Sequence, residues 1–404
     1  MNLSTGRALV AQGGGPTAVI NQSLVGVVLG ARKYPQISGI FGAVQGIQGI
    51  VEENLVDLTE TDARELELVG ATPASALRST RIKPTPEICG RIFEVCRAHD
   101  IRYFFYIGGN DSAEACRIVQ QEAEKRGYEL RVSHVPKTID NDLKVTDHCP
   151  GYGSAAKFVA QAFMGANLDN RSLPGVYIGI VMGRHAGFLT AAAALGRNNP
   201  DDGPHLVYVP EVTFSQGKFL DDVKRTHEKF GRCVIAVSEG ITDDKGKPIV
   251  EQFTGGEKDA HGNIQLSGTG ALGDLLSSWV RAGTSISRVR ADTLGYLQRS
   301  FAGCVSEVDQ AEARRVGEMA VQYAVEEDRP GSVAIRRVGD YAVEYFLTPL
   351  ETVARESTSM PEEFINKDGN DVTEAFLEYA RPLAGPLPTM AHLSAPAVNK
   401  ILDA

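Results

Sequence analysis

The sequence has no long apolar run. Nothing in its 404 residues approaches the roughly 20 consecutive apolar residues that a membrane-spanning helix needs. The first ten residues, MNLSTGRALV, also lack the basic start and apolar core of a secretion signal. We therefore expect a cytoplasmic protein that has no membrane partner.

Paired cysteines and an excess of positive charge are lacking too. The six cysteines are scattered without a Cys-x-x-Cys pair, which argues against a zinc site and against a disulfide framework. The formal charge of −10 argues against a nucleic-acid partner, because such binding depends on Lys and Arg neutralising phosphates. Small phosphorylated molecules can still bind through local basic groups.

What the sequence does contain is a regular alternation of strand-like and helix-like segments. Apolar runs predict strands at 7–13, 102–109, 130–136, 175–183 and 232–240, and segments of helical period lie at 17–32, 111–127, 184–197 and 268–283. This alternation predicts an α/β fold in which helices cover both faces of parallel sheets. Ligands bind such sheets at the carboxyl ends of the strands, and the unusual polar residues of this sequence follow strands.

Glycine-rich turns follow two of the predicted strands, at 13–15 and at 108–109. Backbone N–H groups and a helix N-terminus at such a turn favour phosphate, and a tight turn without a ligand is the alternative. Neither turn matches Gly-x-Gly-x-x-Gly, and no Lys-Ser/Thr pair follows as in a nucleotide-binding P-loop. After the second turn, Asp111 places a negative charge where phosphate would be expected.

Another strand is followed by KTIDND at 137–142. Two carboxylates two residues apart, Asp140 and Asp142, could divide the work of a general base and of a metal or orienting contact. The ammonium group of Lys137 beside them suits a phosphate. A solvated turn is the alternative, because Asp and Asn are good turn formers.

The remaining strand ends carry charged and aromatic residues. Arginines there can bind a phosphoryl group with two hydrogen bonds each, although surface ion pairs would use them equally well. The candidates are Met182, Gly183, Arg184, Glu239, Arg290, Tyr296 and Arg299.

Taken in order, these motifs resemble the phosphofructokinase family from Ala8 to about Arg299. The resemblance is carried by the glycines at 13–14, Ser-Thr-Arg at 79–81, GGNDS, KTIDND, MGR, Glu239 and LGYLQR. It implies two Rossmann-like three-layer αβα domains with mostly parallel sheets and an active-site cleft between them. The phosphoryl-donor domain would comprise 1–148 and 300–345, and the fructose 6-phosphate domain 149–299 and 346–404.

The resemblance also implies a reaction, namely Mg²⁺-dependent phosphoryl transfer to the 1-hydroxyl of fructose 6-phosphate. Asp140 would be the general base. The residues implied at pyrophosphate are Gly13, Gly14, Arg81, Asp111 and Lys137. Those implied at fructose 6-phosphate are Thr138, Ile139, Asp140, Asp142, Met182, Gly183, Arg184, Glu239, Arg290, Tyr296 and Arg299.

Asp111 and Lys137 resemble the pyrophosphate-dependent members of the family, because ATP-dependent members usually carry glycine at both positions. A carboxylate beside the phosphates would occupy the space, and repel the charge, of a nucleotide α-phosphate. Lys137 would stabilise charge on the transferred phosphoryl group or on the leaving phosphate. Asp140, Lys137 and Asp111 are therefore the implied catalytic residues.

Three positions depart from the family pattern. Asn110 stands where many members have a metal-linked Asp, and its amide is expected to orient a Mg²⁺-bound water. Near 171–176 the chain reads RSLPGV and does not present the arginine that tetrameric ATP enzymes of the family lend across a subunit boundary, which predicts a homodimer. Tyr296 replaces a histidine common in the ATP enzymes. The alternatives are an ATP-dependent kinase, a pyrophosphate enzyme preferring sedoheptulose 7-phosphate, and a non-catalytic phosphosugar-binding subunit.

Overall fold

Two sheets organise the chain in the computed structural model, which describes residues 5–252, 270–354 and 357–402. The first sheet has the order β11-β10-β5-β4-β1-β2-β3. Its strands are β1 (Gly6–Gln12), β2 (Ile37–Ala43), β3 (Leu55–Asp57), β4 (Ile101–Gly108), β5 (Arg131–Pro136), β10 (Gly331–Gly339) and β11 (Ala342–Thr348). Neighbours pair in parallel except at the two edges, where β2 with β3 and β10 with β11 are antiparallel.

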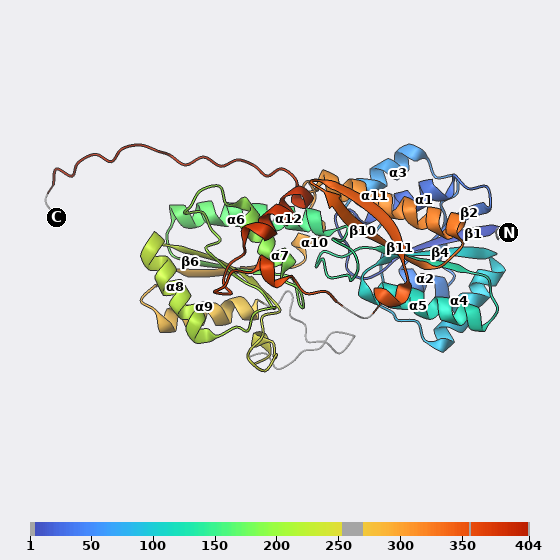
Figure 1. Cartoon of the computed structure of the whole chain (residues 1–404), viewed down its shortest axis with the longest axis horizontal. Helices are drawn as coiled ribbons and strands as arrows, with labels where there is room; N and C mark the ends of the chain where they lie inside the picture. The colour runs from blue at the N-terminus through green and yellow to red at the C-terminus, as the bar shows by residue number, and fades with distance from the viewer. Residues whose placement is uncertain (1–4, 253–269, 355–356, 403–404) are drawn as a thin grey trace.

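Helices cover both faces of this sheet (Figure 1). They are α1 (Ile20–Ala31), α2 (Gly46–Val51), α3 (Ala63–Gly70), α4 (Pro86–Ala98), α5 (Asn110–Lys125) and α11 (Glu307–Gln322). On one face α1 and α11 bury Val25 and Val316 in a shared core. On the other face α2, α4 and α5 pack around Phe93 and Phe104. The first sheet is therefore the middle of three layers.

The second sheet has four parallel strands in the order β7-β8-β6-β9. They are β6 (Val176–Val181), β7 (Leu206–Tyr208), β8 (Cys233–Ser238) and β9 (Val289–Thr293). The helices are α6 (Tyr152–Ser172), α7 (Phe188–Ala191) and α12 (Glu374–Ala384) around Phe163 and Phe376, with α8 (Gln216–Phe230) and α9 (Ala271–Gly283) around Phe219 and Leu276. The predicted fold, two αβα units with mostly parallel sheets, is confirmed.

The chain passes between the two units more than once. After β9 it returns to the first sheet in α11, β10 and β11, and α12 then packs on α6 beside the second sheet. β11 ends at Thr348, whereas the predicted donor segment ended at 345. The domain limits otherwise stay a prediction.

The predicted helix at 184–197 is wrong at its start. Gly183 has φ +137°, and the N–H of Gly187 donates to Glu211 at 2.9 Å, so the residues between them form a loop. Helix α7 begins only at Phe188, and Ala192–Gly196 is a 3-10 turn.

The longest helix in the described ranges, α6, has 21 residues. Neither it nor any other helix in those ranges is long and apolar enough to cross a membrane.

Candidate active site

The carboxyl ends of three neighbouring strands, β5, β4 and β1, form one edge of the site. Lys137 follows β5, and its N–H donates to the carbonyl of Gly108 at the end of β4 (3.0 Å). Its Nζ donates to the carbonyl of Gly15 in the turn after β1 (2.5 Å). The lysine thus connects the two predicted glycine turns.

The turn after β1 has specific backbone requirements. Gly14 has φ +73°, and a Cβ there would lie 3.4 Å from Nζ of Lys137. The N–H of Gly14 donates to Thr80 O (3.1 Å), and that of Gly13 donates to Ile107 O (2.8 Å). The structure therefore corrects the prediction that Gly13 N–H donates to pyrophosphate, because β4 already accepts it. The contact with Thr80 also brings the adjoining Arg81 to this turn.

Lys137 is buried, with only 3% of its surface exposed. Burial, and then the positive charges of Arg299 and Arg81, lower its pKa to about 7 against the opposing charges of Asp140 and Asp142. A buried ammonium surrounded by other cations is stabilised by an anion, so a phosphate beside Lys137 would raise this pKa again.

The loop after Lys137 is held by Asn141, which has φ +58°. Its Oδ1 accepts the N–H of Cys149 (2.8 Å), and its Nδ2 donates to Tyr379 OH (2.7 Å). Asn141 therefore anchors the loop to α12 and leaves the two flanking aspartates as the candidates for chemistry.

The two aspartates have different surroundings. The carboxylate of Asp142 accepts hydrogen bonds from Thr138 Oγ1 (3.3 Å), Asn110 Nδ2 (3.0 Å) and Ser357 Oγ (3.0 Å). In the described part of the chain, the carboxylate of Asp140 has no hydrogen-bond partner. The backbone N–H of Asp140 donates to Thr138 Oγ1 (3.1 Å). Asp142 is thus oriented by its donors, whereas Asp140 is available to take a proton.

The pKa of Asp140 is raised toward neutrality. Burial is the largest cause, and the negative charges of Asp142 and Glu239 add to it, against Arg299 and Lys137. A general base works best when its pKa lies near the working pH. The local electrostatics therefore suit Asp140 to proton transfer.

The second sheet contributes residues from the carboxyl ends of β6 and β8. The carbonyl of Gly183 accepts a hydrogen bond from Ser238 Oγ (2.5 Å), and Glu239 N–H donates to Val181 O (2.9 Å). Because the charge of Glu239 acts on Asp140, these strand ends face the loop that follows β5.

Helix α10 (Leu297–Ser300), after β9, carries Arg299 toward the first sheet. A Cβ on Gly15 would lie 3.1 Å from Cζ of Arg299. The guanidinium also lies 4.8 Å from the ring centroid of Tyr296, a cation–π contact that orients it. Arg299 therefore reaches the donor turn from the second sheet, a position that the prediction, which placed it only at the sugar, did not anticipate.

Some predicted residues do not join this cluster. Arg290 is the second residue of β9 and pairs with Tyr177 at the amino-terminal end of β6, so within this chain it lies at the opposite edge of the sheet. Ile139 and Met182 are only 6% and 4% exposed and pack in the core, so their side chains do not reach a sugar. The strands of a parallel sheet all run in one direction, so their amino-terminal and carboxyl-terminal ends lie at opposite edges of the sheet. Arg290, near the start of β9, therefore lies at the edge away from the site.

Two predicted polar residues have unexpected partners. The carboxylate of Asp111, in the first turn of α5, pairs with Lys83 Nζ at 2.8 Å and is 75% exposed. Asn110 Nδ2 donates to Ser357 Oγ (3.0 Å) as well as to Asp142. Sequence reasoning missed Lys83 and Ser357, because neither lies in a recognisable motif.

The comparisons with known proteins agree with this geometry. The phosphofructokinase family matches residues 7–324. A pyrophosphate–fructose 6-phosphate 1-phosphotransferase of Rhodospirillum rubrum is 59% identical over 400 residues, covering 98% of this chain and 99% of the relative. Pyrophosphate-dependent phosphofructokinase structures from Nitrosospira multiformis and Marinobacter aquaeolei have TM-scores of 0.85 and 0.84 and identities of 34% and 33%. They cover 96% and 98% of this chain, and 94% and 98% of their own chains are matched.

The two αβα units, the polar cluster between their strand ends and these matches define one class of protein. The chain belongs to the phosphofructokinase family.

Proposed function

We propose that this chain transfers a phosphoryl group from pyrophosphate to the 1-hydroxyl of fructose 6-phosphate, giving fructose 1,6-bisphosphate and phosphate. The observation that carries the proposal is the contrast between Asp142, held by three donors, and Asp140, which is half-buried and whose pKa is raised by desolvation and by the negative charges of Asp142 and Glu239. The 59% identity to a phosphotransferase named for pyrophosphate supports the choice of donor.

In this proposal the oxygen of the sugar hydroxyl attacks the terminal phosphorus of pyrophosphate, and Asp140 accepts the proton that this hydroxyl loses. Lys137 and Arg299, the cations beside the glycine turn, stabilise the negative charge on the transferred group and on the leaving phosphate. Arg184 and Glu239 contact the sugar phosphate from the second sheet. In the reverse direction Asp140 returns the proton, and the reaction is readily reversible because the anhydride and the ester differ little in free energy.

Mg²⁺ is the cofactor that we propose, and Asn110 is the residue that fits it. Asn110 Oδ1 is buried without a hydrogen-bond partner, while its Nδ2 is fixed on Asp142 and Ser357. A hard oxygen of this kind suits Mg²⁺, which binds few protein ligands and keeps several waters. When bound, the ion neutralises charge on the donor oxygens.

We also propose that Asp111 selects the donor. Its pairing with Lys83 offsets much of the carboxylate charge, so exclusion of a nucleotide would depend more on occupied space than on repulsion. ATP-dependent members of the family usually carry glycine at the position of Lys137. Here the ammonium group of Lys137 supplies the compensating positive charge. The homodimer and the cytoplasmic location stay predictions.

A donor assay tests the function. With Mg²⁺ and fructose 6-phosphate, we expect the purified chain to form fructose 1,6-bisphosphate from pyrophosphate and not from ATP. Measuring product with each donor, and with sedoheptulose 7-phosphate as a second acceptor, separates the alternatives. Turnover with ATP alone, or with no donor, would contradict the proposal.

The pH dependence of kcat/KM, which reports the free enzyme, follows from the shifted pKa values of Asp140 and Lys137. Asp140 must be ionised to act as the base, so activity falls as the pH drops below its raised pKa. Lys137 must be protonated, so activity falls as the pH rises through about 7. We expect a narrow bell-shaped profile with its maximum near neutrality, measured as initial rates from pH 5.5 to 9.

In kcat at saturating pyrophosphate, the alkaline limb should move to higher pH, because the bound anion favours the charged lysine. A flat profile would contradict these assignments.

A further inference from the structure

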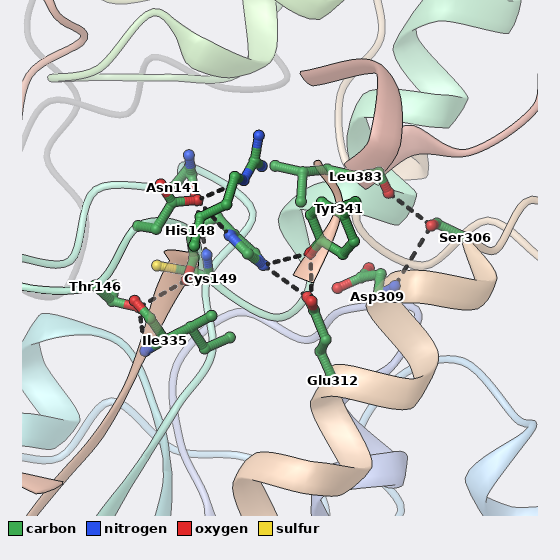
Figure 2. A network of polar contacts seen from close by, with 12 residues as sticks. Asn141, Thr146, His148, Cys149, Ser306, Asp309, Glu312, Ile335, Tyr341 and Leu383 are labelled. Carbon is green, nitrogen blue, oxygen red and sulfur yellow. Dashed lines mark hydrogen bonds and ion pairs between the residues drawn. The ribbon is translucent and has the colours of Figure 1, made fainter. Parts of the chain in front are cut away.

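The loop between β5 and α6, residues 137–151, carries the proposed base but has no helix or strand of its own. A network of polar contacts fixes this loop against β10 and α11 (Figure 2). Thr146 Oγ1 accepts the N–H of Ile335 on β10 (3.0 Å) and donates to the carbonyl of His148 (2.8 Å). Asp147 N–H donates to Ile335 O (2.8 Å). Strand β10 of the first sheet, next to the edge strand β11, thus supports this loop.

His148 is the centre of this network (Figure 2). Its Nδ1 contacts Asp147 Oδ1 at 2.7 Å, and its Nε2 contacts Glu312 Oε2, on α11, at 2.6 Å. The side chains of His148 and Glu312 are 3% and 6% exposed. Tyr341, which follows β10, donates its hydroxyl to Glu312 Oε1. A ring that donates from both nitrogens to carboxylates must be protonated.

The network continues to the aspartates through backbone and side chain. Tyr379 on α12 donates its hydroxyl to the carbonyl of Asp147 (2.8 Å) and accepts from Nδ2 of Asn141 (2.7 Å). Asn141 lies between Asp140 and Asp142. Since α11 covers the first sheet and α12 packs on α6 beside the second, the network ties the loop to both units.

The charged and titratable groups that face His148 come from each element packed against it. Asp147 lies on the loop, Glu312 on α11 and Tyr341 after β10, and Arg337 on β10 places its Nε 3.4 Å from Asp147 Oδ1. Burial lowers the pKa of His148, but the hydrogen bonds and charges of Asp147 and Glu312 outweigh burial and raise it to about 9. The imidazole is therefore charged at neutral pH.

We propose that His148 is a positioning residue for phosphoryl transfer: held between Asp147 and Glu312, it fixes the loop that places Asp140 at the substrate. The inference rests on the proposed function for its kinetic consequence. Without the imidazolium, the buried Glu312 and the half-buried Asp147 would lose their common cation, and the loop would relax away from α11. Misplacing a reacting group by about 1 Å can cost about 100-fold in rate.

Two variants test this role. We expect His148→Gln to lower kcat about 10- to 100-fold while KM for both substrates changes little, because the loop and not the binding residues is displaced. Glu312→Gln keeps the ring but removes one of the two carboxylates that raise the pKa of His148. With Lys137 held charged by bound pyrophosphate, the alkaline limb of kcat at saturating substrates reports His148 and should move down by about one to three pH units. A role in packing alone would lower stability without moving that limb. If His148→Gln does not fold, the alkaline limb of kcat measured in Glu312→Gln tests the positioning role of His148.

The control and a second readout separate this inference from the proposed function. His205→Gln replaces a half-buried histidine just before β7, whose Nδ1 accepts only a backbone N–H, and should leave kcat and its pH profile unchanged. Amide hydrogen exchange over 138–147 should accelerate in His148→Gln and, in the wild type, as the pH is raised through about 9, after correction for intrinsic exchange. Wild-type protein inactive with pyrophosphate would refute the function, and the exchange result would still test the loop. Unchanged exchange together with an unmoved alkaline limb would overturn the inference.

Discussion

Replacing Asp140 with Asn is expected to lower kcat about 10²- to 10⁴-fold, the range that general-base catalysis contributes. The amide has the size of the carboxylate but does not accept the hydroxyl proton. The neighbouring Asp142 does not substitute for it, because Thr138, Asn110 and Ser357 already hold its carboxylate. Steady-state rates with pyrophosphate and fructose 6-phosphate measure the effect, and KM should change far less than kcat.

Stability provides an independent check on Asp140. Its folded pKa lies above its ordinary value, so the ionised group destabilises the protein increasingly as the pH rises from about 4 toward neutrality. Asp140→Asn should therefore unfold at the same temperature as the wild type or higher at pH 7, and the difference should vanish in acid. Asp100→Asn, an exposed carboxylate paired with Arg102, is the matched control and should retain full activity. Near-normal turnover in Asp140→Asn would remove Asp140 from the role of base.

Lys137→Met is expected to lower kcat/KM for pyrophosphate about 10²- to 10³-fold, the loss that follows removal of one preorganised electrostatic group. Methionine fills similar space but brings no charge to the donor turn, where Nζ contacts the carbonyl of Gly15. The loss should appear as weaker donor use, with KM for fructose 6-phosphate less affected. Initial rates over a range of pyrophosphate concentrations measure it.

The control for this variant is Lys125→Met, which removes an exposed lysine paired with Glu122 near the end of α5 and should leave the rates unchanged. Lys137→Arg should not restore activity, because a Cβ on Gly14 would already lie 3.4 Å from the lysine nitrogen and the larger guanidinium has little room. Full activity of Lys137→Met would show that Arg299 or the metal supplies the charge alone.

Several features of the site could be predicted because they depend on local sequence. Apolar strands followed by helices predicted the parallel sheets, and the rule that ligands bind at carboxyl strand ends placed Lys137 and Asp140 at that edge of the first sheet and Glu239 at that edge of the second. The same rule failed for Arg290, because it does not locate a residue along its strand. It also did not reveal that Gly13 N–H is already used by Ile107.

Asn110 illustrates what requires long-range contacts. From the sequence it was only a metal candidate, whereas in the structure its Nδ2 orients Asp142 and its Oδ1 stays without a partner. The partner Ser357 lies 247 residues away along the chain, in a segment without a recognisable pattern. Likewise Glu312 lies 164 residues from His148, and no spacing rule connects them.

The sequence by itself determined the fold class, the order of the motifs and the residue types at the strand ends, since periodicity and turn chemistry act over a few residues. Only the tertiary structure decided which carboxylate is held and which can take a proton. That distinction depends on donors from distant segments, Asn110 and Ser357 at Asp142, and on the desolvation of Asp140 near the charge of Glu239. Hydrogen bonding and desolvation at these aspartates are set by packing between segments that are far apart in the sequence, so the residues adjacent to them in the chain do not reveal either.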